Sequence, residues 1–240
     1  MPGPVQIDAL ARHRAPWRAL LLALPALWLT AGVWRPAGLG GHPLEALEQV
    51  SGRVALLMLL ASLALTPMRR LLSIAARLAR RPHGKRLSDW NKLVPWQRSL
   101  GLAAFAYATL HLGIYVVLDA GLDPAALRDD VLNRRHVLAG GLAWLTMLGL
   151  AMTSLRPGGP PPLLRRWPLA AACAAVLHFW WTVAPARPSP WIETLLLVWI
   201  LGQRLLERLG CLPDWPGSDG EASPVRDSPL SPPRPLKDTP

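Results

Sequence analysis

The sequence has few cysteines and few charged residues for its length, and each shortage excludes a class of protein. Its 240 residues include only Cys173 and Cys211, with no CxxC spacing, so neither a disulfide framework nor a zinc site is expected. Only 17% of the residues are charged and 51% are hydrophobic, a balance that small water-soluble domains seldom have. The lysines and arginines lie between apolar blocks and form no groove or stripe, which argues against nucleic-acid binding.

Six apolar blocks dominate what the sequence does contain. Each is roughly long enough to cross a ~30 Å hydrocarbon layer as a helix, although the second and the sixth are short. They cover residues 16–34, 53–67, 99–118, 137–155, 167–185 and 191–206. No AxA-like cleavage site with a polar region behind it follows the first block, so that block is expected to be retained. We therefore predict an all-α membrane protein, with a six-transmembrane-helix bundle over residues 16–206 after a short N-terminal segment, 1–15.

The distribution of basic residues predicts the orientation in the membrane. Most of the lysines and arginines near the helix ends fall on one side, above all in the loop 68–98. The positive-inside rule then places both termini in the cytoplasm. The same loop forms a basic surface suited to anionic lipid or to an acidic partner. The tail 207–240 is rich in Pro, Ser, Gly and Asp without apolar periodicity, and we expect it to be a disordered cytoplasmic tail.

Two histidines lie deep inside apolar blocks, where an ionisable side chain is costly and suggests a function. They are His111 in "YATLHLGIY" and His178 in "AVLHFWW". His111 is thirteen residues beyond Arg98 and His178 is thirteen beyond Arg165, about 20 Å of helix in each case. Both helices are predicted to run from inside to outside, so the two imidazoles should lie at one depth, as a shared ligand requires. The other histidines fall in loops or at helix ends, where a solvated side chain is expected: His13, His42, His83 and His136.

The surroundings of these two histidines favour some ligands over others. No third histidine, cysteine or carboxylate is expected at that depth, which disfavours a zinc or copper site. Axial ligation of haem iron needs only two imidazoles and an apolar, aromatic pocket. Aromatic residues and glycines near both histidines suit a flat ring: Phe105, Tyr107, Phe179, Trp180, Trp181, Gly101, Gly113, Gly140 and Gly141. The residues alone leave open that each histidine only hydrogen-bonds a neighbouring helix, as in a membrane transporter or scaffold.

Four segments, in order, resemble a known family. They are "GLGGHPLEALEQVSGRVALLMLLASLALTPMRRL", "QRSLGLAAFAYATLHLGIY", "AMTSL" and "VLHFWWTV". Over about residues 15 to 205 the chain resembles the MsrQ (YedZ) family, haem-binding membrane subunits within the ferric-reductase-like transmembrane group. The resemblance implies a six-helix bundle with b-type haem, in which His111 and His178 correspond to iron ligands and Arg98 to an arginine one level below.

The resemblance also implies partners and a place in the cell. Members of the family lie in the bacterial inner membrane and pass electrons from a cytoplasmic reductant, through haem and flavin mononucleotide (FMN), to a periplasmic molybdopterin reductase, MsrP. That partner repairs oxidised methionines in envelope proteins. We therefore expect MsrP as partner, and a cytoplasmic flavin reductase, another donor or a quinone as the source of electrons.

One departure from the family pattern concerns the number of haems. Family members carry a further histidine on the fifth helix, thirteen residues before the one that matches His178. Here that position falls on Arg165, or is lost in a deletion after Trp167, and a guanidinium has no lone pair for iron. We therefore expect one haem. Arg98 and Arg165 are expected instead to bind haem propionates or a flavin phosphate through charge-assisted hydrogen bonds.

The chemistry expected of the chain is electron transfer, with no catalytic residue of its own. Electrons should leave toward the outer loops 35–52 and 119–136, whose acidic residues suit the orientation of a partner: Glu45, Glu48, Asp119, Asp123, Asp129 and Asp130. No NADPH- or FAD-binding domain follows the six blocks, so the electrons are expected to come from another molecule. A haem protein that reduces ferric iron or exchanges electrons with quinone is the alternative within the same group.

Overall fold

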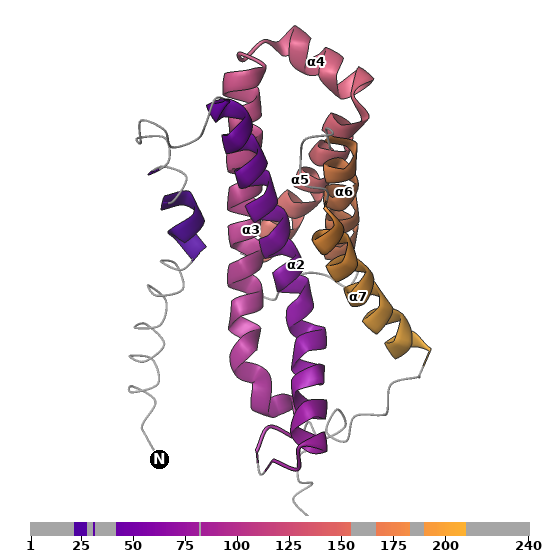
Figure 1. The fold of residues 1–240 in the computed structure, drawn as a ribbon. Helices are drawn as coiled ribbons and strands as arrows, with labels where there is room; N and C mark the ends of the chain where they lie inside the picture. The colour runs from indigo at the N-terminus through magenta and orange to yellow at the C-terminus, as the bar shows by residue number, and fades with distance from the viewer. Residues whose placement is uncertain are drawn as a thin grey trace, which may run out of the picture.

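Every regular element in the described part of the chain is a helix, which confirms the predicted all-α class (Figure 1). The computed structural model describes residues 22–27, 31, 42–81, 83–154, 167–182 and 190–209. Residues 22–27 are helical. The helices that follow are α2 (Pro43–Leu78), α3 (Val94–Ile114), α4 (Pro124–Asn133), α5 (Arg135–Ser154), α6 (Trp167–Thr182) and α7 (Trp191–Arg208), with a 3-10 segment η1 (Leu87–Leu93) and a π-helical segment η2 (Tyr115–Asp119).

Three of the described helical segments are long and apolar enough to cross a membrane. They are Pro43–Leu78, Leu87–Asp119 and Arg135–Ser154. α6 has only 16 described residues, and α7 has 18 residues that include charged side chains at both ends. Most of the first predicted block, the segment 1–15 and the tail beyond residue 209 lie outside the described residues. The number of six spans therefore stays a prediction.

α2 is longer at both ends than the predicted span 53–67. It begins at Pro43, a residue favoured in the first helical turn, and Glu45 in that turn complements the helix dipole. Part of the predicted outer loop is thus helical, because hydropathy marks where a helix enters lipid and not where the helix begins. At the other end α2 continues through buried Pro67 to Leu78. Helices packed in a bundle tolerate such an interior proline, because neighbouring groups can satisfy the backbone that it leaves unpaired.

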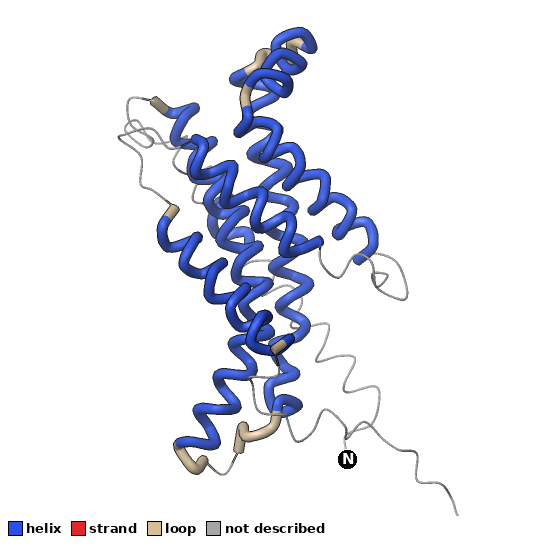
Figure 2. The backbone as a smooth tube through the Cα atoms, turned by 90° about the vertical axis from the view of Figure 1, so that its right-hand side faces the viewer, coloured by secondary structure: helices blue, strands red, loops and turns tan. Residues whose placement is uncertain are grey.

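The helices form two packed pairs (Figures 1 and 2). α2 lies along α3, and α5 lies along α6. α7 packs mainly on α2 and also touches α6. α4 crosses over one end of the bundle and joins α3, through η2, to α5 (Figure 1). We call this the α4 end, and we call the opposite end, where η1 connects α2 to α3, the η1 end.

Small and branched side chains close the centre of the bundle. Leu60 of α2, Ala104 of α3, Ala172 of α6 and Ile200 of α7 are fully buried in one apolar cluster. Alanines at such contacts let helix backbones approach closely, which is how helices pack in membranes. This core cluster lies in the middle of the bundle and does not extend to the α4 helix.

Candidate functional site

His111 of α3 and His178 of α6 lie together near the α4 end. Their ring centroids are 6.0 Å apart and the ring planes cross at 75°. The two residues come from different helix pairs, so the fold brings them together from distant parts of the chain. The equal depth read from the sequence agrees with this proximity. Their role as iron ligands stays a prediction.

A neighbouring oxygen accepts from the Nδ1 atom of each imidazole. His178 Nδ1 lies 2.6 Å from the carbonyl oxygen of His136, which can only accept a hydrogen bond, so Nδ1 carries the proton. His111 Nδ1 lies 3.4 Å from Ser51 Oγ, whose own proton goes to the carbonyl oxygen of Glu48 at 3.1 Å. Nδ1 of His111 is then the donor as well. A proton on Nδ1 leaves the lone pair of Nε2 free, which is the arrangement that metal-binding histidines use.

Two glycines make room for the two rings. A Cβ on Gly52 of α2 would lie 3.2 Å from the His111 ring, and a Cβ on Gly140 of α5 would lie 2.9 Å from His178 Nδ1. A Cβ on the adjacent Gly141 would have no atom within 4 Å. The sequence pointed to Gly140 and Gly141 alike and missed Gly52. Only the helix packing shows which glycines touch the histidines.

A cavity of about 360 Å³ adjoins the two histidines at the α4 end. Its walls come from α2, α3, η2, α4, α5 and α6 and are mainly apolar. Of the five aromatic residues that the sequence suggested, Phe179 lines it; Trp144, which the sequence did not suggest, lines it too. The lining also includes polar and charged side chains: Glu48, Gln49, Arg53, Tyr115, Asp119, Arg134, His136 and Thr182.

The described lining of this cavity contains two arginines, neither of which the sequence suggested as a ligand-binding residue. Arg98 lies near the start of α3, exposed, and outside the cavity lining, and Arg165 lies outside the described residues. Arg53 and Arg134 are the arginines in the described lining, and the roles predicted for Arg98 and Arg165 stay predictions. In the sequence, Arg53 and Arg134 both stand at the edge of an apolar block, where a charge is expected to mark the end of a span. Only Arg53 carried a sequence signal for an inward-facing charge, because it directly follows a glycine inside a helix-forming segment.

The described residues fit a haem held through two axial imidazoles. With metal–nitrogen bonds of about 2 Å and about 1.2 Å from nitrogen to ring centre, two imidazoles on one iron have centroids roughly 6.4 Å apart. The observed separation is 6.0 Å. Among the described residues no group of three or more His, Cys, Asp or Glu is arranged to hold an ion. Two imidazoles at this separation beside a mainly apolar cavity suit a metal that brings its own equatorial ligands, as haem iron does.

Comparison with known proteins identifies the family. Residues 51–158 match the family model described as "Ferric reductase like transmembrane component". A protein of Azospira oryzae is 35% identical over 222 residues, which cover 90% of this chain and 86% of the relative. That relative is named protein-methionine-sulfoxide reductase heme-binding subunit MsrQ. The chain belongs to the MsrQ family.

Further MsrQ relatives support the same assignment. Proteins of this name from Yersinia pseudotuberculosis and Yersinia pestis are each 32% identical over 188 residues. The aligned segment covers 76% of this chain and 84% and 83% of the two relatives, respectively. No solved structure matches the chain. As a member of the MsrQ family, with three apolar helices of spanning length among its described residues, the chain is a multi-pass membrane protein with a role in electron transfer.

Proposed function

We propose that this chain is the haem-bearing electron-transfer subunit of a methionine sulfoxide reductase system, with one b-type haem bound between His111 and His178. The observation that carries the proposal is the pair of imidazoles, 6.0 Å apart beside an apolar cavity. The bound haem supplies one-electron redox chemistry. With Arg165 in place of the family's further histidine, a second haem of ordinary ligation has no ligand there.

The chain's own residues prepare the site. The carbonyl of His136 accepts from His178 Nδ1 and fixes the tautomer and the ring orientation, which also makes the free Nε2 more basic. Ser51 does the same for His111 over a longer distance. The apolar walls exclude water, and burial of this kind is one of the means by which a protein sets a haem potential.

The proposed placement in the cell follows from charge. The domain 16–206 crosses the bacterial inner membrane six times, with both termini in the cytoplasm. The η1 end, with exposed Arg80, Arg81, Lys85 and Arg86, then faces the cytoplasm and its electron donor, a flavin reductase, another reductant or quinone. FMN bound near Arg98 belongs to this entry route. The α4 end faces the periplasm.

The proposed acceptor is the periplasmic molybdopterin reductase MsrP. The α4 end presents the exposed carboxylates Asp119, Asp123 and Asp129, which favour a partner with a basic docking face. MsrP would take electrons there and use them to repair oxidised methionines. The chain itself binds no methionine sulfoxide in this proposal.

A pyridine haemochrome assay with a reduced-minus-oxidised spectrum tests the proposal on purified protein. We expect about one haem b per chain, lost in both His111→Ala and His178→Ala, because a low-spin haem needs both imidazoles. His83→Ala, an exposed histidine at the η1 end, is the matched control and should keep the full spectrum.

Two other outcomes would overturn the proposal. A full spectrum in both variants would mean that the intramembrane histidines serve the fold or a proton path. Absence of haem from the unaltered protein would favour a transporter or scaffold. A flavin assay on the same sample measures whether FMN is bound.

A further inference from the structure

We infer that Arg53 and Arg134 bind the two carboxylates of the porphyrin, so that the propionate edge of the haem points to the α4 end. The inference rests on the proposed function, because it assumes that a haem occupies the cavity. It concerns two residues that neither the family resemblance nor the predicted arginines, Arg98 and Arg165, pointed to.

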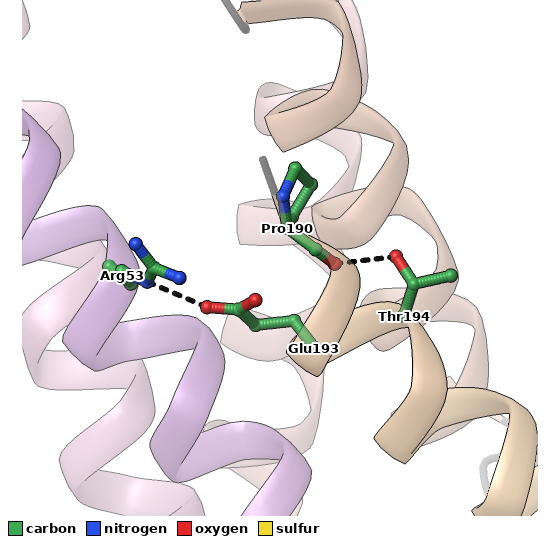
Figure 3. Close-up of polar contacts among 4 residues, drawn as sticks. All are labelled: Arg53, Pro190, Glu193 and Thr194. Carbon is green, nitrogen blue, oxygen red and sulfur yellow. Dashed lines mark hydrogen bonds and ion pairs between the residues drawn. The ribbon is translucent and has the colours of Figure 1, made fainter. Parts of the chain in front are cut away.

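Arg53 is held in place by a buried carboxylate (Figure 3). Its Nε donates to Glu193 Oε1 at 2.7 Å, and the side chain of Glu193 is 1% exposed. Glu193 lies in the first turn of α7, where the helix dipole favours a negative charge. The ion pair uses Nε, and the two terminal nitrogens of Arg53 have no hydrogen-bond partner among the described residues. These two nitrogens are therefore available to a ligand.

The position of Glu193 is itself fixed by neighbouring contacts. Thr194 Oγ1 donates to the carbonyl oxygen of Pro190 at 2.7 Å (Figure 3). It also accepts from Trp180 Nε1 of α6 at 2.9 Å. These bonds anchor the start of α7 beside α6. Glu193 Oε2 is buried with no hydrogen-bond partner in the described part of the chain. Since a buried carboxylate with an unsatisfied oxygen is costly, the ion pair with Arg53 is the contact that offsets part of this cost.

Arg134 repeats the arrangement at the cavity rim. Its Nε lies 3.0 Å from Asp130 Oδ1, and Asp130 Oδ2 accepts from the hydroxyl of Tyr115 at 2.6 Å. Tyr115 and Arg134 both line the cavity. In each arginine a carboxylate takes Nε and leaves the terminal nitrogens, the part of a guanidinium that pairs best with a second carboxylate.

The cavity wall also carries negative charges, so a ligand with two carboxylates needs the two arginines as cationic partners. Glu48 and Asp119 also line the α4 end, so a propionate without a cationic partner would meet like charge. Arg53 and Arg134 are the only lysines or arginines in the described lining. Apart from its charged residues and histidines, the described lining offers only the neutral polar side chains Gln49, Tyr115, Trp144 and Thr182, so a propionate turned away from both arginines would lack an ionic partner there.

The test compares haemin with its dimethyl ester, whose two carboxylates are blocked. The full-length protein, stripped of haem, is titrated with each porphyrin and binding is followed by the Soret band. We expect the unaltered chain to bind haemin about tenfold more tightly than the ester, since charge-assisted hydrogen bonds are strong in apolar surroundings. Arg53→Gln and Arg134→Gln should each weaken haemin binding several-fold and leave ester binding unchanged. Arg128→Gln, an exposed arginine of α4 outside the lining, is the matched control.

Two further variants test the same inference if Arg53→Gln does not fold. Arg53→Lys retains a charge and should keep part of the preference for haemin over the ester. Glu193→Gln removes the carboxylate that positions Arg53. It should weaken binding of haemin, and so reduce the difference in affinity between haemin and the ester, without affecting binding of the ester.

Equal affinity of the unaltered chain for haemin and ester would overturn the inference and leave the proposed function standing. Equal weakening of both porphyrins by Arg53→Gln would assign that residue a structural role only. A chain that gives no Soret band with either porphyrin would overturn the proposed function itself.

Discussion

The ring of His178 occupies space that a methyl group on residue 140 would need. A Cβ on Gly140 would lie 2.9 Å from His178 Nδ1, the atom that meets the carbonyl of His136 at 2.6 Å. Neither the ring nor the backbone can yield without losing that hydrogen bond. At Gly141, the next residue along α5, nothing lies within 4 Å. The site thus depends on the absence of one carbon atom at one of two adjacent glycines.

This contrast predicts opposite effects of one substitution at neighbouring positions. Alanine is favoured over glycine inside a helix by about 1 kcal/mol, so Gly141→Ala should stabilise the protein slightly and retain haem. Gly140→Ala should displace the His178 ring and weaken haem binding about tenfold, with a shifted Soret band. Haem titration of both variants measures this. Equal haem affinity of the two variants would show that the close approach at Gly140 does not affect haem binding.

At the scale of helices, one hydroxyl connects α3 to the first apolar block. Tyr107 is buried, donates to the carbonyl oxygen of Leu22 at 2.8 Å and accepts from the N–H of Ala26 at 2.9 Å. The acceptor carbonyl and the donor N–H are four residues apart, so the hydroxyl is inserted into the hydrogen-bond ladder of that helix. Tyr107 lies four residues before His111 on α3, yet it does not line the cavity.

Tyr107→Phe should therefore lower stability without changing the haem site. Loss of the hydroxyl removes two hydrogen bonds, and we expect a decrease of about 1 to 2 kcal/mol in the free energy of unfolding. Denaturation of the purified protein in detergent measures it, while the reduced haem spectrum serves as the internal control. A changed spectrum with unchanged stability would contradict this assignment.

The helices also show what sequence patterns can and cannot locate. The spans around His111 and Gly140 were predictable because apolar blocks of spanning length are rare outside membranes. α4 was missed, because a short polar helix across the end of a bundle leaves no apolar block. Arg53 and Arg134 were missed as cavity residues for a related reason. A charge beside an apolar block looks like the end of a span, and only packing shows that it faces inward.

At the scale of the whole molecule, the depth of the two histidines was the most informative sequence feature. Counting thirteen residues from Arg98 and from Arg165 placed two imidazoles at one level, because helical rise is nearly constant. The rings do lie 6.0 Å apart. Which nitrogen each ring leaves free depends on Ser51 and on the carbonyl of His136, and no one-dimensional pattern contains that information.

The proposed orientation of the molecule predicts the results of reporter fusions. Alkaline phosphatase joined at residue 122, between α3 and α4, should be active, because the enzyme folds only in the periplasm. Green fluorescent protein joined at residue 85, at the η1 end, should fluoresce. The positive-inside rule gives this direction because basic residues concentrate at the η1 end. Active phosphatase at residue 85 together with fluorescence at residue 122 would show that the molecule has the opposite orientation.

The position of the cavity near one end of the bundle has an electrical consequence. Arg98, near the η1 end of α3, lies thirteen residues before His111, about 20 Å along the helix. In the proposed orientation, an electron that enters at the η1 end and reaches the cavity would cross most of the membrane's electric field. One elementary charge gains about 2.3 kcal/mol per 100 mV over the full thickness. If the η1 end faces the cytoplasm, as proposed, the negative interior of an energised cell would drive the electron outward. Reduction of the proposed periplasmic partner would then draw on the membrane potential as well as on the reductant.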